Sequence, residues 1–245
     1  MPAETPTPEP FTRTYRAAMA VCVPIVSVWG RLQVEGLEAL PRGGPVLVVG
    51  NHDSQSDPIA IGVAARKRRQ IRALAKRELW DKPFLGRILD GMGQIPIERA
   101  AGDAVALVNA IAVLREGACI GVFPEGTISV GRVLRARSGI GRLALEVPEA
   151  RLVCVAVHGT PALARFPERP RIRVRFFEPA SGQTDPSETA VGLSQRLLDE
   201  IRAIAPPVDA GRDPAKTLAK YERKLAEREE AAAKRRAEAA DRERV

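Results

Sequence analysis

From residue 32 onward, short apolar runs alternate with stretches of helical periodicity, and this alternation limits the possible fold more than any other feature. Strands are expected at PVLVVG, QIRALA, QIPIE, CIGVFP and RLVCVAV, all between residues 45 and 157. Apolar residues at helical spacing lie between them, as in DAVALVNAIAVLREG at 103–117. The pattern is typical of an α/β domain with a mostly parallel or mixed central sheet flanked by helices.

Two further segments complete this domain, which is expected to span residues 32–206. RIRVRFF at 171–177 alternates strictly between charged and apolar residues, which indicates a half-exposed strand near a sheet edge. The stretch from 184 to 207 is expected to form a closing helix. Asp185 is the expected N-cap of that helix, with Pro186 at its first position.

The two ends of the chain differ from the domain in composition. Residues 1–10 are rich in proline and threonine and are expected to be disordered. Residues 207–245 are rich in alanine and in charges of both signs, which favours an exposed helical tail.

The segment at 11–31 is apolar, with Arg16 and Arg31 near its ends. Its uncharged core, from Ala17 to Gly30, has 14 residues, fewer than the ~20 apolar residues that a membrane-spanning helix needs, and Pro24 interrupts it. Tyr15 and Trp29 near its ends suit the membrane interface, so an interfacial anchor helix at the cytoplasmic face of the cell membrane is predicted. The alternative is an ordinary buried helix.

The charge balance favours anionic partners. The chain has 38 Lys and Arg against 30 Asp and Glu, a net charge of +8, and a basic concentration in RKRRQIRALAKR at 66–77. Nucleic acid is disfavoured because aromatic residues make up only 4% of the chain and no nucleic-acid-binding motif accompanies the charge. An anionic membrane surface remains open. The three cysteines lack CxxC spacing, so they are expected to be small core residues, with no zinc site.

The stretch VVGNHDSQSDP at 48–58 carries the first candidate chemistry. His52 and Asp57 are five positions apart, roughly 140° around a helix, so they can meet only across a turn. Such a turn after a buried strand can fold the carboxylate onto the imidazole, which creates a general base with an orienting acid. Separately, Asp57 can be a helix N-cap and His52 an ordinary loop histidine.

Two more turns follow expected strands. In FPEGTIS at 123–129, Glu125 can bond a substrate hydroxyl or organise the loop, and Gly126 permits close backbone approach to a ligand. The alternative is a simple β-turn of favoured residues. In GQIPIER at 93–99, Arg99 can hold a phosphate through two hydrogen bonds, although a lone surface arginine is usually only solvated.

Together these stretches resemble the 1-acylglycerol-3-phosphate acyltransferase family of glycerolipid acyltransferases. His52 and Asp57 match its HxxxxD motif, GQIPIER its second motif and FPEGTIS its FPEGTRS motif. VCVAVHGT at 153–160 resembles its fourth motif, and AKRELW at 75–80 its AK-x-EL segment. The order and spacing agree from about residue 34 to 177.

The resemblance implies the roles of individual residues. His52 would deprotonate the acceptor hydroxyl and Asp57 would orient it, without an acyl-enzyme, metal or cofactor. Glu125, Gly126 and Thr127 would position the acceptor and stabilise the oxyanion. Arg99 would hold the phosphate. The donor would be acyl-CoA or acyl carrier protein, anionic enough to suit the basic run, with Lys76 as a candidate contact.

Two positions depart from the family pattern. Ile128 stands where the third motif usually has arginine, so one phosphate ligand is missing, and Cys154 replaces a proline at what is expected to be a strand end. The acceptor can therefore be 1-acylglycerol-3-phosphate, giving phosphatidic acid in phospholipid biosynthesis, or a lysolipid without a phosphomonoester, such as a lyso-ornithine lipid. A non-catalytic lipid- or CoA-binding protein of the same fold is the rival from another class.

Overall fold

The computed structural model describes residues 10–97, 104–165 and 167–208, with isolated helical positions between 215 and 230. The prediction for residues 1–10 lies outside this part of the chain except at Pro10, and most of the predicted tail lies outside it too. Within the described residues one sheet has seven strands, in the order β1-β7-β6-β2-β5-β3-β4. They are β1 (Gln33–Glu35), β2 (Val46–Gly50), β3 (Arg72–Lys76), β4 (Ile95–Ile97), β5 (Cys119–Val122), β6 (Arg151–His158) and β7 (Arg173–Phe177).

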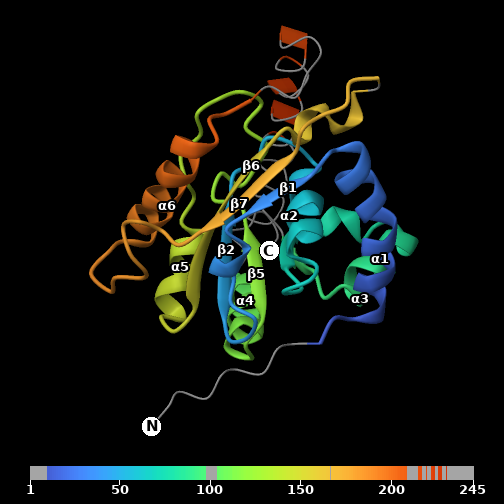
Figure 1. Cartoon of the computed structure of the whole chain (residues 1–245). Coiled ribbons are helices and arrows are strands. Elements are labelled where there is room, and N and C mark those ends of the chain that lie inside the picture. Colours follow the sequence, from blue (N-terminus) through green and yellow to red (C-terminus); the bar gives the residue numbers. More distant parts are fainter. Residues whose placement is uncertain are drawn as a thin grey trace, which may run out of the picture.

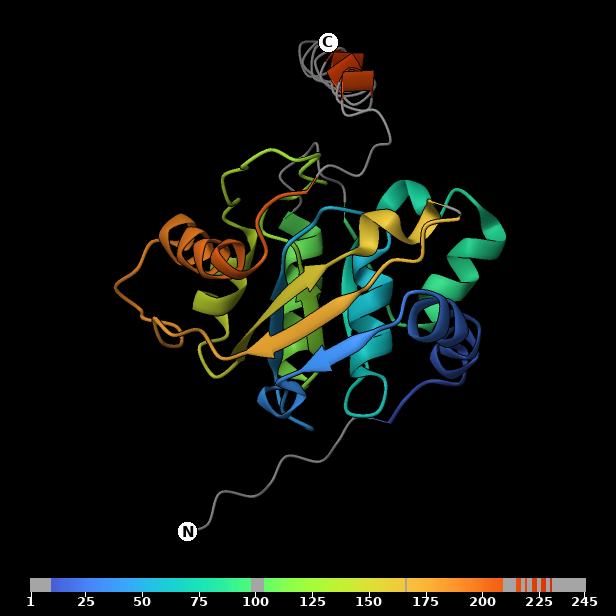
Figure 2. The ribbon, with the colours of Figure 1, turned by 45° about the horizontal axis from the view of Figure 1, so that its top comes forward.

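The sheet is mixed. Strands β6, β2, β5, β3 and β4 are parallel to one another, whereas β7 pairs antiparallel with β6 and parallel with β1. Figure 2 shows β7 and β1 side by side, opposite in direction to β6. All the predicted strands are present, and β7 alternates between exposed and buried residues as expected. The short edge strand β1 was not predicted, because three residues are too few for a periodic signal.

Helices cover both faces of the sheet, as Figure 1 shows. Within β2, Val46 and Val48 face the core shared with α1 and α2, and Leu47 and Val49 face the core shared with α4, α5 and α6. Successive strand side chains point to opposite faces, so a strand buried on both sides is apolar throughout.

The helices are α1 (Arg13–Val23), α2 (Asp57–Ala65), α3 (Pro83–Gly91), α4 (Ala104–Arg115), α5 (Gly139–Glu146) and α6 (Ala190–Ile204), with short helical turns η2 (Leu37–Ala39), η3 (Arg77–Leu79) and η4 (Thr160–Ala164).

The closing helix α6 begins later than the sequence indicated. Its N-cap is Thr189, whose hydroxyl oxygen accepts a hydrogen bond from the N–H of Gly192 at 3.0 Å. The carboxylate of Asp185 instead accepts from the N–H of Ser187 at 2.8 Å, which closes a separate turn. The prediction of Asp185 as the N-cap is therefore wrong, because a second capping residue lies four positions further along.

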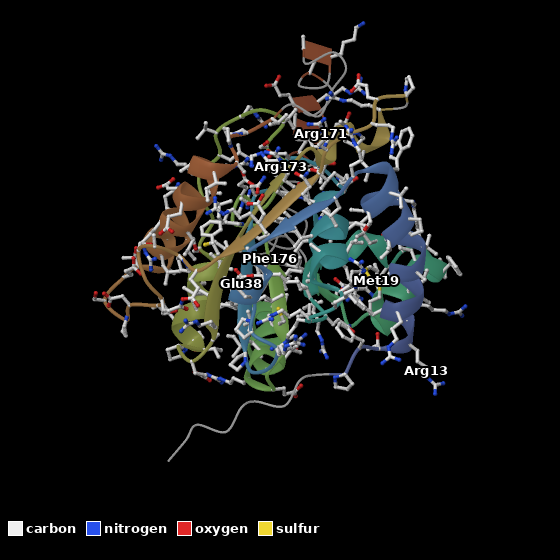
Figure 3. The ribbon with its side chains drawn as sticks, viewed as in Figure 1. Arg13, Met19, Glu38, Arg171, Arg173 and Phe176 are labelled. Atoms are coloured by element: carbon white, nitrogen blue, oxygen red, sulfur yellow. The ribbon has the colours of Figure 1, made fainter. Side chains whose placement is uncertain are left out.

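The apolar segment near the N-terminus forms α1 and the π-helical η1 (Pro24–Trp29). Tyr15, Met19 and Val26 are buried in the core, and the Tyr15 hydroxyl donates to the carbonyl of Gly62 in α2 at 3.1 Å. Figure 3 shows Met19 pointing from α1 into the protein and Arg13 pointing away. The face of the segment that carries these residues therefore packs as in an ordinary buried helix.

The opposite side of this segment exposes large apolar residues. Val21 and Val28 are 67% and 68% exposed, and Ile25 is 48% exposed. Among the described helices, none combines the length and apolarity needed to cross a membrane. Attachment of this side to a membrane interface stays a prediction.

The connections after β2 and β5 leave the carboxyl ends of these neighbouring strands in opposite directions. The chain leaves β2 through α2 toward β3, whereas it leaves the neighbouring β5 through α5 toward β6, on the other side of β2. Ligands of open α/β sheets bind where neighbouring connections leave in opposite directions. The loops after β2 and β5 carry His52 and Asp57 in the first case and Glu125, Gly126 and Thr127 in the second.

Candidate active site

The loop after β2 brings His52 and Asp57 together across a turn. Nδ1 of His52 lies 3.0 Å from Oδ2 of Asp57. Asp57 is completely buried, and His52 is only 8% exposed. Because Asp57 is bonded to Nδ1, Nε2 is the ring nitrogen that can accept a proton from a substrate. The geometry suits a general base with an orienting carboxylate.

Asp57 is the first residue of α2, but its carboxylate turns back toward the preceding loop. Oδ2 accepts hydrogen bonds from the N–H groups of Asp53 and Ser54, both at 2.7 Å. Oδ1 accepts from the hydroxyl of Thr160, in the loop after β6. The N-cap position belongs to Ser56, whose side chain makes no capping bond. The interpretation of Asp57 as an N-cap is therefore wrong, and its partners are those of an orienting residue.

The loop after β5 holds the backbone of the His52 loop. Oε2 of Glu125 accepts from the N–H of His52 at 2.7 Å, and the N–H of Ser129 donates to the carbonyl of His52 at 2.8 Å. The ring of Phe123 stacks on the imidazole, with 4.3 Å between centroids. Of the two interpretations of Glu125, these contacts favour loop organisation over bonding to a substrate hydroxyl.

Arg202, in the last turn of α6, is a site residue that the sequence analysis missed. Its Nε donates to Oε1 of Glu125 at 3.0 Å, and its two terminal nitrogens donate to the carboxylate of Asp53 at 2.9 Å each. Arg202 lies four positions after Leu198, on the helix stripe that packs into the core. An arginine on an apolar stripe is the signal that could have identified it.

Burial and neighbouring charges shift the pKa values of Glu125 and His158 at this end of the strands. Burial raises the pKa of Glu125 above its usual value, and the hydrogen bond and positive charge of Arg202 oppose that rise. Burial also lowers the pKa of His158 at the end of β6, with Arg173 adding to the effect. Both effects favour the neutral form of His158.

Gly126 sits in a tight turn with a φ of 67°, a conformation that favours glycine. Its N–H donates to the carbonyl of Phe123 at 3.0 Å, so that N–H already has a partner within the turn. A Cβ at this position would lie 2.7 Å from Cδ of Arg137, which shows that the arginine side chain lies directly over Gly126. Thr127, next in the turn, is half-buried.

The two departures from the family pattern occupy different environments. Ile128 is half-buried in the loop that carries Glu125. Cys154 is completely buried in the middle of β6, not at a strand end as expected. Cysteine fits there because it has a backbone N–H and a small apolar side chain.

The remaining candidates are spread more widely. Lys76 ends β3, two strands from β2, at the same edge of the sheet as His52. Arg99 lies outside the described residues, so the structure does not locate it. Across the part of the chain that the structure describes, no group of three or more His, Cys, Asp or Glu residues is arranged as a metal site.

The basic run is divided between the two ends of the sheet. Arg68 and Arg69 follow α2, which leads away from the His52 edge, and both donate to backbone carbonyls, including that of Glu38 at 3.0 Å and that of Gly44 at 2.7 Å. Only the end of the run, at Lys76 and Arg77, reaches the edge that carries His52. The run is therefore not one continuous binding patch.

Known proteins are similar to this chain in sequence. The Acyltransferase family model matches residues 31–161. The chain is 36% identical over 134 residues to a 1-acyl-sn-glycerol-3-phosphate acyltransferase from Borreliella burgdorferi, covering 52% of each protein. It is 26% identical over 190 residues to the enzyme of the same name from Bacillus subtilis, covering 76% of this chain and 94% of that protein.

The fold also resembles a solved structure. The crystal structure of the 1-acyl-sn-glycerophosphate (LPA) acyltransferase PlsC from Thermotoga maritima superimposes with a TM-score of 0.54 at 24% identity, covering 78% of this chain and 84% of that one. The family match spans more than half of the chain and includes both loops that build the His52 and Asp57 site. The chain therefore belongs to the Acyltransferase family.

Proposed function

We propose that this protein transfers a fatty acyl group from acyl-CoA or acyl carrier protein to the hydroxyl of 1-acylglycerol-3-phosphate, which yields phosphatidic acid. The observation that carries the proposal is the buried His52 and Asp57 pair, with Nδ1 and Oδ2 3.0 Å apart just after β2. Relatives that carry the name of this activity support it.

In this reaction Nε2 of His52 removes the proton of the acceptor hydroxyl as the oxygen attacks the thioester carbonyl. A carbon–oxygen bond forms, and the carbonyl electrons move to oxygen, giving a tetrahedral oxyanion. When the oxyanion collapses, the carbon–sulfur bond breaks and the thiolate of the donor leaves. The imidazolium, stabilised by Asp57, returns its proton to that thiolate.

The loop at 123–129 contributes differently from what the family resemblance implied. The carboxylate of Glu125 is bonded to the His52 N–H and to Arg202, so we assign it to holding the base in place. We assign Gly126 to the close approach of the Arg137 side chain, which lies over this turn. We assign Thr127 and Lys76 to substrate contacts, Thr127 in the same turn and Lys76 at the same sheet edge.

A phosphate on the acceptor needs cationic partners, and the arginine that the third motif usually supplies is replaced here by Ile128. We assign one such role to Arg99 and a second to Arg137, because the Arg137 side chain lies over Gly126 beside the departure. A half-buried Ile128 also favours a second candidate, an acceptor without a phosphomonoester, since an apolar residue needs no anionic partner.

The protein is proposed to act at the cytoplasmic face of the cell membrane, where its lysolipid acceptor resides. The exposed side chains of Val21, Ile25 and Val28 provide an apolar surface, and the net charge of +8 favours anionic lipid.

In the decisive experiment, the purified protein is incubated with a panel of lysolipids and a donor whose acyl group is labelled, either acyl-CoA or acylated acyl carrier protein. The products are then separated. Labelled phosphatidic acid from lysophosphatidic acid is the expected result. Transfer only to lysolipids without a phosphomonoester would favour the second candidate. Binding of acyl-CoA without any transfer would identify a non-catalytic binding protein.

A further inference from the structure

Arg202 joins two buried carboxylates that belong to different loops. Its Nε and terminal nitrogens bond Asp53 and Glu125 at 2.9–3.0 Å, and one terminal nitrogen also donates to the carbonyl of Ala205 at 3.1 Å. The Arg202 side chain is 11% exposed, and the side chains of Asp53 and Glu125 are 4% and 0% exposed. The whole cluster is therefore withdrawn from water.

Both acids are tied to the backbone around His52, Glu125 through its carboxylate and Asp53 through its own main-chain N–H. Glu125 accepts from the N–H of His52 at 2.7 Å, and the N–H of Asp53 donates to Oδ2 of Asp57 at 2.7 Å, the same oxygen that faces the imidazole. A shift of either carboxylate would move the peptide groups that flank the proposed base. Arg202 thus lies one contact away from the atoms that hold His52, without touching the imidazole itself.

The charges also require the arginine. Asp53 and Glu125 are two acids that share one buried cation, and their carboxylates would repel each other without it. Asn51 adds one hydrogen bond, from its side-chain nitrogen to Oδ2 of Asp53 at 3.0 Å, but no charge. Removal of the guanidinium would leave an uncompensated pair beside the His52 loop.

We infer that Arg202 is a positioning residue for His52, and that α6 is part of the catalytic unit although it lies beyond the family match, which ends at residue 161. The inference rests on the proposed acyl transfer. Its chemistry is electrostatic and geometric: one guanidinium fixes two loops so that the imidazole faces its substrate in a constant orientation.

The test compares Arg202→Met and Arg202→Lys with a matched control, Arg196→Met, on the same helix. Arg196 bonds Glu188 at 2.7 Å and the carbonyl of Gly182 at 3.1 Å, in the segment after β7. Because β7 runs antiparallel to β6, this segment starts at the opposite edge of the sheet from His52. Both methionine variants remove a bridging arginine from α6, but only one acts near the site.

We expect Arg202→Met to lower kcat by about 100-fold, the cost of a small misplacement of catalytic groups, with a smaller change in KM for the acyl donor. Arg202→Lys should recover part of kcat, since it keeps the charge but not the fork of donors. Arg196→Met should lower the unfolding temperature and leave kcat unchanged. All assays are run well below the unfolding temperature of the least stable variant.

A pH profile separates positioning from plain stability. Arg202 and the His52 N–H lower the pKa of Glu125, whereas Asp53 raises it. Without Arg202, Glu125 takes up its proton at higher pH. The acid limb of the profile of kcat against pH should therefore shift to higher pH in Arg202→Met. It should stay in place in Arg196→Met.

The inference is overturned if folded Arg202→Met keeps the kcat of the wild type, or loses no more than Arg196→Met. Should Arg202→Met fail to fold, Asp53→Asn serves instead, because it keeps the volume and removes half of the bridge; unchanged kcat in that variant overturns the inference equally. A wild-type protein without any acyl transfer contradicts the proposed function instead. In that case, unchanged amide exchange at residues 51–57 in Arg202→Met would also refute the positioning role.

Discussion

The hydroxyl of Thr160 donates to Oδ1 of Asp57, 103 positions away in the sequence, while His52 is bonded to Oδ2 of the same carboxylate. Asp57 is therefore fixed from two strands at once, because Thr160 follows β6 and His52 follows β2. The rotation of the carboxylate, and with it the direction of the imidazole, depends on both loops.

Thr160→Val should lower kcat by about 10- to 100-fold, because a hydrogen bond to a charged group contributes about 1.5–3 kcal/mol. Thr160→Ser keeps the hydroxyl and should remain close to the wild type. Steady-state kinetics of both variants check this, and equal rates for Val and Ser would show that the Thr160 bond does not orient Asp57.

Replacement of the proposed base should separate activity from stability. His52→Ala is expected to reduce kcat by ~100- to 10,000-fold, the usual contribution of a general base, with little change in the unfolding temperature. Asp57→Asn should lower both kcat and the unfolding temperature. An amide nitrogen would then face the N–H of Asp53 or the hydroxyl of Thr160, where the wild type has an acceptor oxygen. Near-normal turnover in either variant would contradict the mechanism.

The buried acid Glu125 predicts a pH-dependent difference in stability. Its pKa is raised in the folded state, so the folded protein takes up this proton more readily than the unfolded chain. The resulting stabilisation is complete below the unfolded pKa of 4.5 and is lost as the pH rises through the folded pKa. Relative to Glu125→Gln, the wild type should therefore lose free energy of unfolding as the pH rises through that window. Urea unfolding of both proteins from pH 4 to 7 measures the difference, and a constant gap would refute the prediction.

The acceptor phosphate can be tested at Arg137, with Arg135 in the same loop as a matched exposed control. Arg137→Ala should raise the KM for lysophosphatidic acid by about 10-fold or more, since a charge-assisted bond to phosphate is lost, and Arg135→Ala should change it little. If Arg137 serves a phosphate, Ile128→Arg should increase turnover of the same acceptor. If Ile128 lines an apolar wall, the new charge should instead decrease turnover or stability. Equal KM values for wild type and Arg137→Ala would argue against a phosphate at this turn.

Membrane attachment is best tested on the surface of α1 and η1, not by truncation. Removal of residues 1–31 would delete Tyr15, Met19 and Val26 from the core and is expected to destabilise the whole domain. Replacement of Val21, Ile25 and Val28 by serine should reduce co-sedimentation with anionic vesicles while the unfolding temperature changes little. Equal vesicle binding by the triple variant and the wild type would exclude this surface as the anchor.

Much of the fold was predictable because its strands and helices are local patterns. The apolar run at β2 and the periodic stretch at α4 identify themselves within a few residues. The pairing of His52 with Asp57 was expected for a similar reason, because five positions around a turn leave few arrangements in which both side chains face one another. Edge strand β1 and the start of α6 were not, because three residues carry no period and two capping residues compete.

The sequence alone therefore determined the α/β class and the pairing of His52 with Asp57, since both depend on residues close together in the chain. Only the tertiary structure decided which distant groups complete the site. Thr160 and Arg202 reach Asp57, Asp53 and Glu125 because the parallel strands end together and the last turn of α6 lies next to the loops that follow them. Contacts over such separations depend on the order of the strands and the packing of helices on the sheet, which no local pattern encodes.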